Sequence, residues 1–235
     1  MLRYRFLPAV VVAALLIAGP LISGRLVPPF VGVSTFVAGG ALGLVFGLIM
    51  IGTGLFGLLR RRTWAMKTLG AGALPLLGAL VVAGIFVLRP GPAHRFNDVT
   101  TDLADPPLFA DGPAAAQPYP DDFRPWHVEV YPDLKSQRFD AAPDRVFDAA
   151  LATAQAIDGW DIVRQDRAAG TIQVLVRTSI FRFEDDVVIR IRPDGAGSVV
   201  DLRSKSRIGQ GDRGANAARI RDFLARLSQK LTTSS

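Results

Sequence analysis

Three long runs of apolar residues occupy the first third of the chain and constrain its fold more than any other feature. They cover about residues 7–23, 33–59 and 66–88, and none contains an acidic side chain. About 20 apolar residues are enough for a helix to cross a bilayer. The first run follows a basic start without a good cleavage site after it, which favours a retained helix over a removed signal peptide. The sequence therefore predicts a membrane domain of three transmembrane helices over residues 1–89.

Basic residues flank these runs, and their distribution predicts the orientation of the chain. The loop between the second and third runs carries four cations and the loop between the first and second carries one: Arg60, Arg61, Arg62 and Lys67 against Arg25. Loops rich in Lys and Arg stay on the cytoplasmic side of a membrane. We therefore expect a bacterial inner-membrane protein with its N-terminus in the cytoplasm and residues 90–235 in the periplasm.

The formal net charge of +6 does not predict a nucleic-acid-binding protein, because the excess of cations belongs to the membrane part. Residues 90–235 hold 19 Lys and Arg residues against 21 Asp and Glu residues. The sequence contains no Cys, which excludes disulfides, thiol nucleophiles and Cys-based metal sites. The lipid bilayer is the first partner that the composition predicts, and no nucleic acid is expected.

Glycines recur every four residues in the second apolar run, at Gly39, Gly43 and Gly47. This spacing places them on one face of a helix, where another helix can approach closely. Two interpretations follow. The face packs against the other two helices of the same chain, or it forms a homodimer or contacts another membrane protein.

A Pro-rich stretch, residues 90–124, separates the membrane domain from the rest of the chain. It carries several aromatic and apolar side chains that need burial, among them Phe96, Phe109 and Phe123. A flexible linker would not carry them. We therefore expect an extended segment that packs on a folded domain over residues 125–235.

The hydrophobic pattern of residues 125–235 predicts an α+β fold. A helix begins at Pro143 and ends before Gly159, and a second begins near Asp212, a good N-cap residue. Between them lie alternating segments typical of strands, at residues 160–165, 171–180, 187–191 and 199–207. Short turns imply an antiparallel sheet, with both helices covering one face in a two-layer arrangement. TATA-binding-protein-like and short helix-grip folds share this plan, an analogy that implies no function.

Three separated motifs resemble those of a bacterial and plastid family catalogued as domain of unknown function 1499. They are FNDVTTD at 96–102 with Pro106 and Pro107, FEDDVVIR at 183–190, and the stretch from Arg203 to Arg221. The resemblance covers about residues 94–230, and the preceding helices are similar to those of its membrane-anchored versions. It implies a domain boundary near residue 94 and, since the family has no established activity, no catalytic residue.

Alternation along the strands places a basic set of residues on the sheet face away from the helices. The candidate binding face consists of Arg177, Arg190, Arg192, Arg203, Lys205 and Arg207. Two interpretations remain open. The face is a solvated array of cross-strand ion pairs, or it is an open site for an anionic lipid, an acidic polymer or a protein partner, since guanidinium groups match phosphate oxygens.

A second group of polar residues lies where the last strand turns into the last helix. The candidate structural corner comprises Asp185, Ser204, Ser206, Gly209, Asp212, Asn216 and Arg219. Asp185 is expected to point toward the helices and to need a cation such as Arg219. The serines are expected to face the same way and to find partners at the start of the last helix. The sequence favours a structural clamp here over a metal or acid–base site.

Catalytic motifs are missing from the sequence. His94 and His127 have no partner at metal-site or catalytic-triad spacing. We therefore predict no catalytic residue, no metal and no cofactor. The predicted function is a noncatalytic envelope module that binds a lipid, an anionic polymer or a protein. The alternatives are a scaffold subunit of a membrane complex and a hydrolase with an unrecognised site.

Overall fold

The computed structural model describes residues 7–87 and 96–233, which form two compact units. The helical unit contains the three N-terminal helices, and the second unit, here called the domain, contains the sheet and the remaining helices. The units comprise Met1–Pro90 with Ser179–Arg182, and Gly91–Thr178 with Phe183–Ser235.

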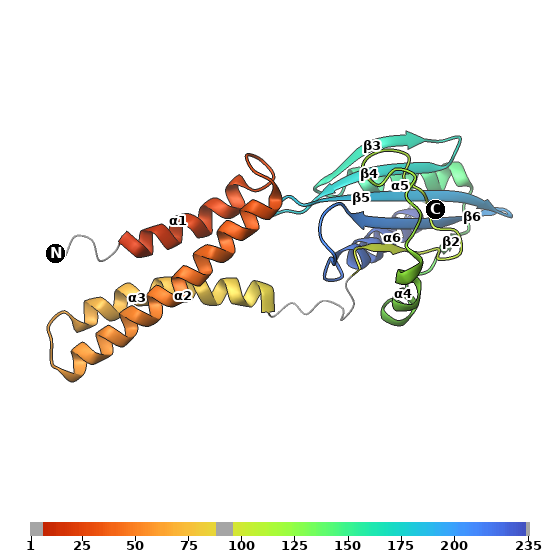
Figure 1. Ribbon diagram of the computed structural model, residues 1–235. Helices are drawn as coiled ribbons and strands as arrows, with labels where there is room; N and C mark the ends of the chain where they lie inside the picture. The colour runs from red at the N-terminus through yellow and green to blue at the C-terminus, as the bar shows by residue number, and fades with distance from the viewer. Residues whose placement is uncertain (1–6, 88–95, 234–235) are drawn as a thin grey trace. The chain divides into compact units, whose positions relative to one another are not determined.

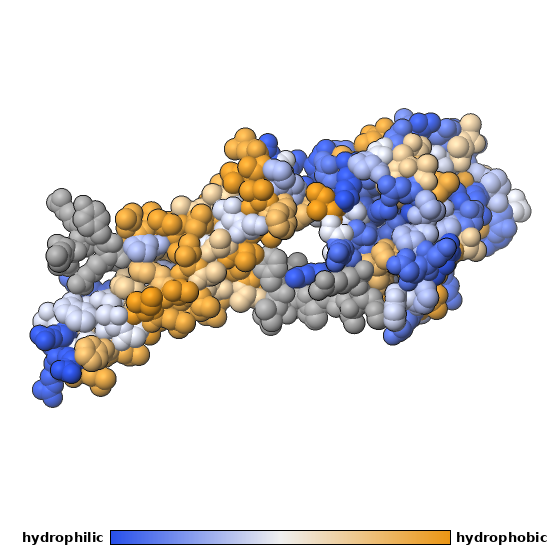
Figure 2. All heavy atoms as spheres, viewed as in Figure 1, coloured by the Kyte–Doolittle hydropathy of each residue, from blue (hydrophilic) through white to orange (hydrophobic). Residues whose placement is uncertain are grey.

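The helical unit consists of α1 (Leu7–Ile22), α2 (Pro29–Leu59) and α3 (Ala65–Val87) (Figure 1). By length and composition, α2 and the stretch Ala65–Ile85 of α3 are each able to cross a membrane. The first predicted span is a helix of 16 described residues, shorter than a membrane span needs, so within the described residues two helices rather than three meet this criterion. The visible surface of the helices is largely hydrophobic, whereas the connection between α2 and α3 is hydrophilic (Figure 2).

Glycines bring the helices of this unit close together. A Cβ atom added at Gly43 would lie 2.7 Å from the carbonyl oxygen of Pro75 in α3, and one at Gly39 would lie 3.0 Å from Leu15 in α1. At Gly47 it would meet Leu76 of α3 at 2.9 Å. The predicted glycine face is therefore occupied by helices of the same chain, which is the first of the two interpretations above.

The domain is built on an antiparallel sheet whose strands follow the order β1-β6-β5-β4-β3, with β2 also paired to β6 (Figure 1). Gly195, at a positive φ of 60°, makes the turn between β5 and β6. This arrangement confirms the predicted α+β class with an antiparallel sheet, while the likeness to the two named folds stays a prediction. The strands are β1 (Asp98–Thr100), β2 (Gln137–Phe139), β3 (Trp160–Asp166), β4 (Thr171–Arg177), β5 (Glu184–Asp194) and β6 (Gly197–Ser206).

Two long helices, α5 (Pro143–Gln155) and α6 (Ala215–Thr233), share one hydrophobic core with the sheet. Pro143 at the first position of α5 has the backbone angle that a helix start requires. Phe223 of α6 is fully buried and stacks on Trp160 of β3 with ring centroids 5.5 Å apart. Alternation along the strands sends Ile172, Ile189 and Leu202 into the same core.

The Pro-rich stretch belongs to the domain and contributes a strand to its sheet. β1 pairs with β6 in the register Asp98–Lys205 to Thr100–Arg203. A short 3-10 helix, η2 (Asp121–Phe123), and α4 (Arg124–Val130) follow. The boundary predicted at residue 125 therefore divides a sheet that begins at Asp98, because a three-residue strand leaves too short a hydrophobic pattern to recognise.

Candidate functional site

The basic face predicted from the sequence lies on the side of the sheet away from α5 and α6. A segment that we call the strap, residues 101–118, connects β1 to the region before α4 and contacts this face. Gln173 of β4 fastens the strap: its side-chain oxygen accepts hydrogen bonds from the amides of Ala110 and Asp111, and its nitrogen donates to the Asp111 carbonyl at 2.6 Å. Phe109 and Ala114 of the strap bury Val188 of β5 in a small second core.

Arg203 is the centre of this arrangement and has no exposed surface. Its Nε and one terminal nitrogen donate to the two carboxylate oxygens of Asp98 at 2.9 and 2.7 Å. Its terminal nitrogens also donate to three carbonyl oxygens, those of Pro107, Gln117 and Pro118. The guanidinium lies 5.0 Å from the ring centroid of Phe109 and 5.5 Å from that of Tyr119. The arginine is therefore paired and hydrogen-bonded within the chain, as a buried charge requires.

The two arginines of β5 bind acids of the strap and of β6. Arg190 donates to Asp201 at 3.0 Å, Asp102 at 3.2 Å and Asp105 at 2.9 Å. Arg192 donates to the same Asp102 and Asp201 carboxylates. Asp201, which is fully buried, also accepts a hydrogen bond of 2.5 Å from Ser136. The cluster holds three acids and two arginines and has no excess of positive charge.

The three remaining members of the predicted face are also paired. Lys205 donates to the Gln117 side chain at 2.7 Å and lies 3.6 Å from Asp98. Arg207 donates to both carboxylate oxygens of Asp186 and to one of Glu184, and the hydrogen bond that it donates to Asp186 raises the pKa of Arg207. Arg177 pairs with Glu184 at 3.1 Å and with Asp161.

The expectation that this face is open to solvent is therefore wrong at its centre. The sequence placed Arg203 correctly opposite the helices, but the strap covers it and supplies acids and carbonyl oxygens to the face. The interpretation as ion pairs accounts for the geometry of all six residues. Whether any partner binds this face stays a prediction.

The polar corner beside α6 has the partners expected of a clamp. Asp185 accepts a hydrogen bond from Arg219 at 2.6 Å, and both side chains are largely buried. Ser204 donates to the Asn216 side-chain oxygen at 2.7 Å and accepts from Arg219 at 2.8 Å. These contacts join the neighbouring strands β5 and β6 to the first turns of α6.

Asn216 ties the same corner to the start of β1. Its nitrogen donates to the Asn97 carbonyl oxygen at 3.0 Å and to Ser206 at 3.2 Å. Asp212 accepts hydrogen bonds from the backbone amides of Gly214 and Asn216, at the start of α6, which begins at Ala215. Gly209 adopts a φ of 99° and accepts a hydrogen bond of 2.6 Å from Asn97.

A buried aromatic cluster near β1 includes His127, for which the sequence indicated no role. His127 is 1% exposed, and its Nδ1 lies 3.0 Å from the Tyr119 hydroxyl, which donates to the Asp98 carbonyl oxygen at 3.2 Å. The Nε2 atom of His127 and the Tyr131 hydroxyl have no hydrogen-bond partner among the described residues. Burial lowers the pKa of His127 to about 4 and raises that of Tyr131 to about 12. His94, the other histidine, lies outside the described residues.

The polar groups of this region form ion pairs and hydrogen bonds that join parts of the same chain. In the sequence Asp98 stands out only as part of a family motif, and its pairing with Arg203 follows from the register of β1 against β6, which only the structure gives. Within residues 7–87 and 96–233, no group of three or more His, Asp or Glu side chains is placed to hold a metal ion. The described polar side chains of the face and the corner instead pair strands, strap and helix with one another.

Comparison with known proteins agrees with the motifs quoted above. The family model described as a protein of unknown function (DUF1499) matches residues 98–227, from the first residue of β1 into α6. A search of curated proteins found no match.

Among solved structures, CalU16 from Micromonospora echinospora is similar at 18% identity and a TM-score of 0.30, over 42% of this chain and 76% of that one. TTHA0849 from Thermus thermophilus is similar at 10% identity and a TM-score of 0.26, over 43% and 96%. Likeness of this extent carries no argument about fold or function. The family match covers more than half of the chain, including Asp98, Arg203 and the polar corner, and the chain belongs to the DUF1499 family.

Proposed function

We propose that this chain is a membrane-anchored envelope protein whose domain is a noncatalytic binding module, held outside the cytoplasm for a protein or lipid partner. The observation that carries the proposal is the contrast in charge between the units. Two helices of membrane-spanning length lie in a stretch of 89 residues without one acid, whereas the domain pairs its charges within itself. A membrane anchor favours the first pattern, and a stable water-exposed domain favours the second.

The orientation in this proposal depends on α3 and the loop before it. Arg60, Arg61, Arg62 and Lys67 favour a cytoplasmic position for the connection between α2 and α3. If α3 then crosses the membrane, the domain lies on the opposite side. This argument does not depend on whether the shorter α1 also crosses, although we propose that it lies within the membrane beside α2.

The paired charges support a protein or lipid partner over an acidic polymer. Arg190, Arg203 and Arg207 each already bind a carboxylate, so a polyanion would have to displace acids of the same chain. Removing one partner of a buried pair is costly because the other charge is left without compensation. A partner that binds by surface complementarity leaves these ion pairs intact and avoids this energetic cost.

Membrane extraction and a topology reporter test the proposal. The full chain should remain with membranes after alkaline carbonate washing. Alkaline phosphatase fused after Ser235 should be active, while a fluorescent protein that matures only in the cytoplasm should be dark at the same site. As a matched control, fusion within the loop at Arg61 should give the reverse pattern. A bright cytoplasmic reporter after Ser235 would overturn the orientation, and release by carbonate would overturn the anchor.

A further inference from the structure

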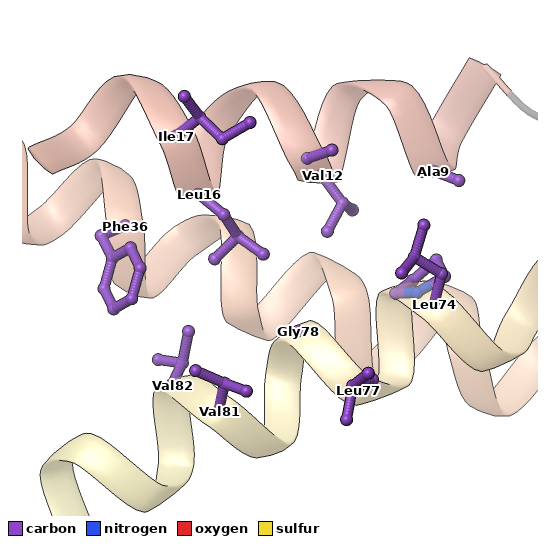
Figure 3. A pocket seen from close by; sticks show the side chains of 12 residues that line it. Ala9, Val12, Leu16, Ile17, Phe36, Leu74, Leu77, Gly78, Val81 and Val82 are labelled. Atoms are coloured by element: carbon purple, nitrogen blue, oxygen red, sulfur yellow. The ribbon is translucent and has the colours of Figure 1, made fainter. Parts of the chain in front are cut away.

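An apolar cleft lies between α1 and α3 within the helical unit (Figure 3). It has a volume of about 330 Å³ and is lined by twelve residues, none of which has a polar or charged side chain. Val12 and Leu16 of α1 and Leu74 and Val82 of α3 point into the space between the two helices, and Phe36 of α2 lies at one end. Pockets for small ligands begin at about this size, in a range of roughly 300–1,000 Å³.

The cleft is a consequence of how the three helices pack. Gly39 brings α1 against α2, and Gly43 and Gly47 bring α3 against the same helix. α1 and α3 are thus fastened to α2 at backbone distance, and they meet each other at Gly78, where a Cβ atom would lie 2.7 Å from Leu16. Closing the cleft would require α1 or α3 to leave its glycine contacts, so the space is built into the packing.

Its length suits a linear hydrocarbon chain. The α1 residues that line the cleft run from Ala9 to Ile17, a rise of about 12 Å along a helix at about 1.5 Å per residue. In a bilayer the surrounding solvent is acyl chains, so an apolar cleft of this shape is filled by one of them.

Charge identifies the head group. Arg25 lies in the turn between α1 and α2, beyond the end of the cleft marked by Ile17 and Phe36. Among the described residues, one guanidinium nitrogen of Arg25 donates to the carbonyl oxygens of Pro20 and Leu21, and no carboxylate neutralises it. Arginine binds phosphate oxygens through paired hydrogen bonds. A basic residue at the membrane surface favours an anionic lipid.

We propose that the cleft holds one acyl chain of an anionic phospholipid whose phosphate group binds Arg25. The lipid is then a specific component of the helical unit, and it lies on the membrane side opposite the α2–α3 loop. This inference rests on the proposed membrane anchor.

Photolabelling of the full chain in nanodiscs tests the inference. The probe is phosphatidylglycerol with a diazirine in its acyl chain, diluted in phosphatidylcholine, with labelled positions mapped by mass spectrometry. Labelling is expected at Ile17, Leu77 and Val81 in excess of lipid-facing positions such as Leu44 and Leu48, which are exposed on α2. The Ala13→Phe variant fills the cleft and should abolish this excess. The Ala14→Phe variant, which adds the same ring at an exposed position outside the cleft, should retain it.

The head group is tested separately with Arg25→Gln. Cleft labelling by the phosphatidylglycerol probe should fall about fivefold, as expected when one basic contact with an anionic lipid is lost. Labelling by the same probe with a phosphatidylcholine head group should fall less, because the choline cation offsets the charge of its phosphate.

Equal labelling of cleft and outer positions, or equal labelling in the two Phe variants, would overturn the inference while the anchor stands. A chain that carbonate releases from membranes would instead overturn the anchor itself.

Discussion

The two units of this protein solve the problem of close packing in opposite ways. In the helical unit, residues without side chains allow close contact: Gly43 and Gly47 let α3 approach the backbone of α2. In the domain, charged side chains of opposite sign are buried as pairs, as at Arg203 and Asp98. In the membrane that we propose for this unit, lipid supplies little hydrophobic drive between helices, so backbone proximity has to hold them. In the domain the hydrophobic effect drives packing, because water surrounds it. The buried charges of the domain then determine where the strap lies.

The largest effect is expected at the buried ion pair. Asp98→Asn leaves Arg203 without a compensating charge, and the domain should lose about 3–5 kcal/mol of unfolding free energy. Urea unfolding of the full chain in detergent, followed by near-ultraviolet circular dichroism, measures the loss. Arg226→Gln removes an exposed pair with Asp222 and serves as the control, with an expected change below about 0.5 kcal/mol.

A double variant sharpens this result. Arg203→Met combined with Asp98→Leu removes both charges, so the loss should be smaller than the sum of the losses of Arg203→Met and Asp98→Leu alone. Additive losses would mean that the two residues act independently and that the pair does not hold the strap.

The sequence anticipated the parts of the domain that depend on local pattern. Alternation assigned Arg203, Lys205 and Arg207 to one side of β6 and Ser204 and Ser206 to the other, and the corner contacts agree with that assignment. α5, α6 and the antiparallel strands follow from the same periodicity.

The strap could not be derived in the same way. Its position depends on contacts between residues about 100 positions apart in the chain, such as Asp98 with Arg203, and on backbone carbonyls that no sequence pattern marks. An arginine in an alternating strand looks the same whether water or a strap covers it. The burial of Arg203, and with it a structural role, is therefore evident only in the structure.

Acid should weaken the domain through His127, an effect of about 3–4 kcal/mol. Its pKa in the folded domain is about 4, below the ordinary value of 6.5. The unfolded chain therefore takes up a proton as the pH falls below about 6.5, while the folded domain does not do so until about pH 4. Each unit of pKa difference corresponds to about 1.4 kcal/mol. The stability contributed by neutral His127 is thus fully present above about pH 6.5 and is lost between that value and about pH 4.

Comparing the pH dependence of unfolding with that of His127→Phe isolates this contribution, because the carboxylates titrate in both proteins. The difference in stability between wild type and variant should change over pH 6.5 to 4. A constant difference across that window would mean that His127 takes up its proton at the same pH in the folded domain and in the unfolded chain.

In the helical unit the expected effect is smaller and steric. Gly43→Ala places a Cβ atom 2.7 Å from the Pro75 carbonyl oxygen, so α2 and α3 must move apart at a cost of about 1–3 kcal/mol. Gly52→Ala is the matched control, since no atom lies within 4 Å of the added carbon. Far-ultraviolet circular dichroism during unfolding in mixed micelles of sodium dodecyl sulfate measures both. Equal stability of the two variants would mean that close backbone contact at Gly43 does not hold α2 and α3 together.

The central claim is that the strap is a permanent part of the domain and that the basic face beneath it is structural. Val188 lies under the strap at 2% exposure, and the chain has no natural cysteine. The most direct measurement is the rate at which a maleimide labels the thiol of a Val188→Cys variant of the full chain, compared with an Asp105→Cys variant at an exposed strap position. The account predicts prompt labelling at position 105 and labelling at position 188 only at the rate of global unfolding. Fast labelling at position 188 in the folded protein, slowed by an added anionic lipid or polymer, would contradict it.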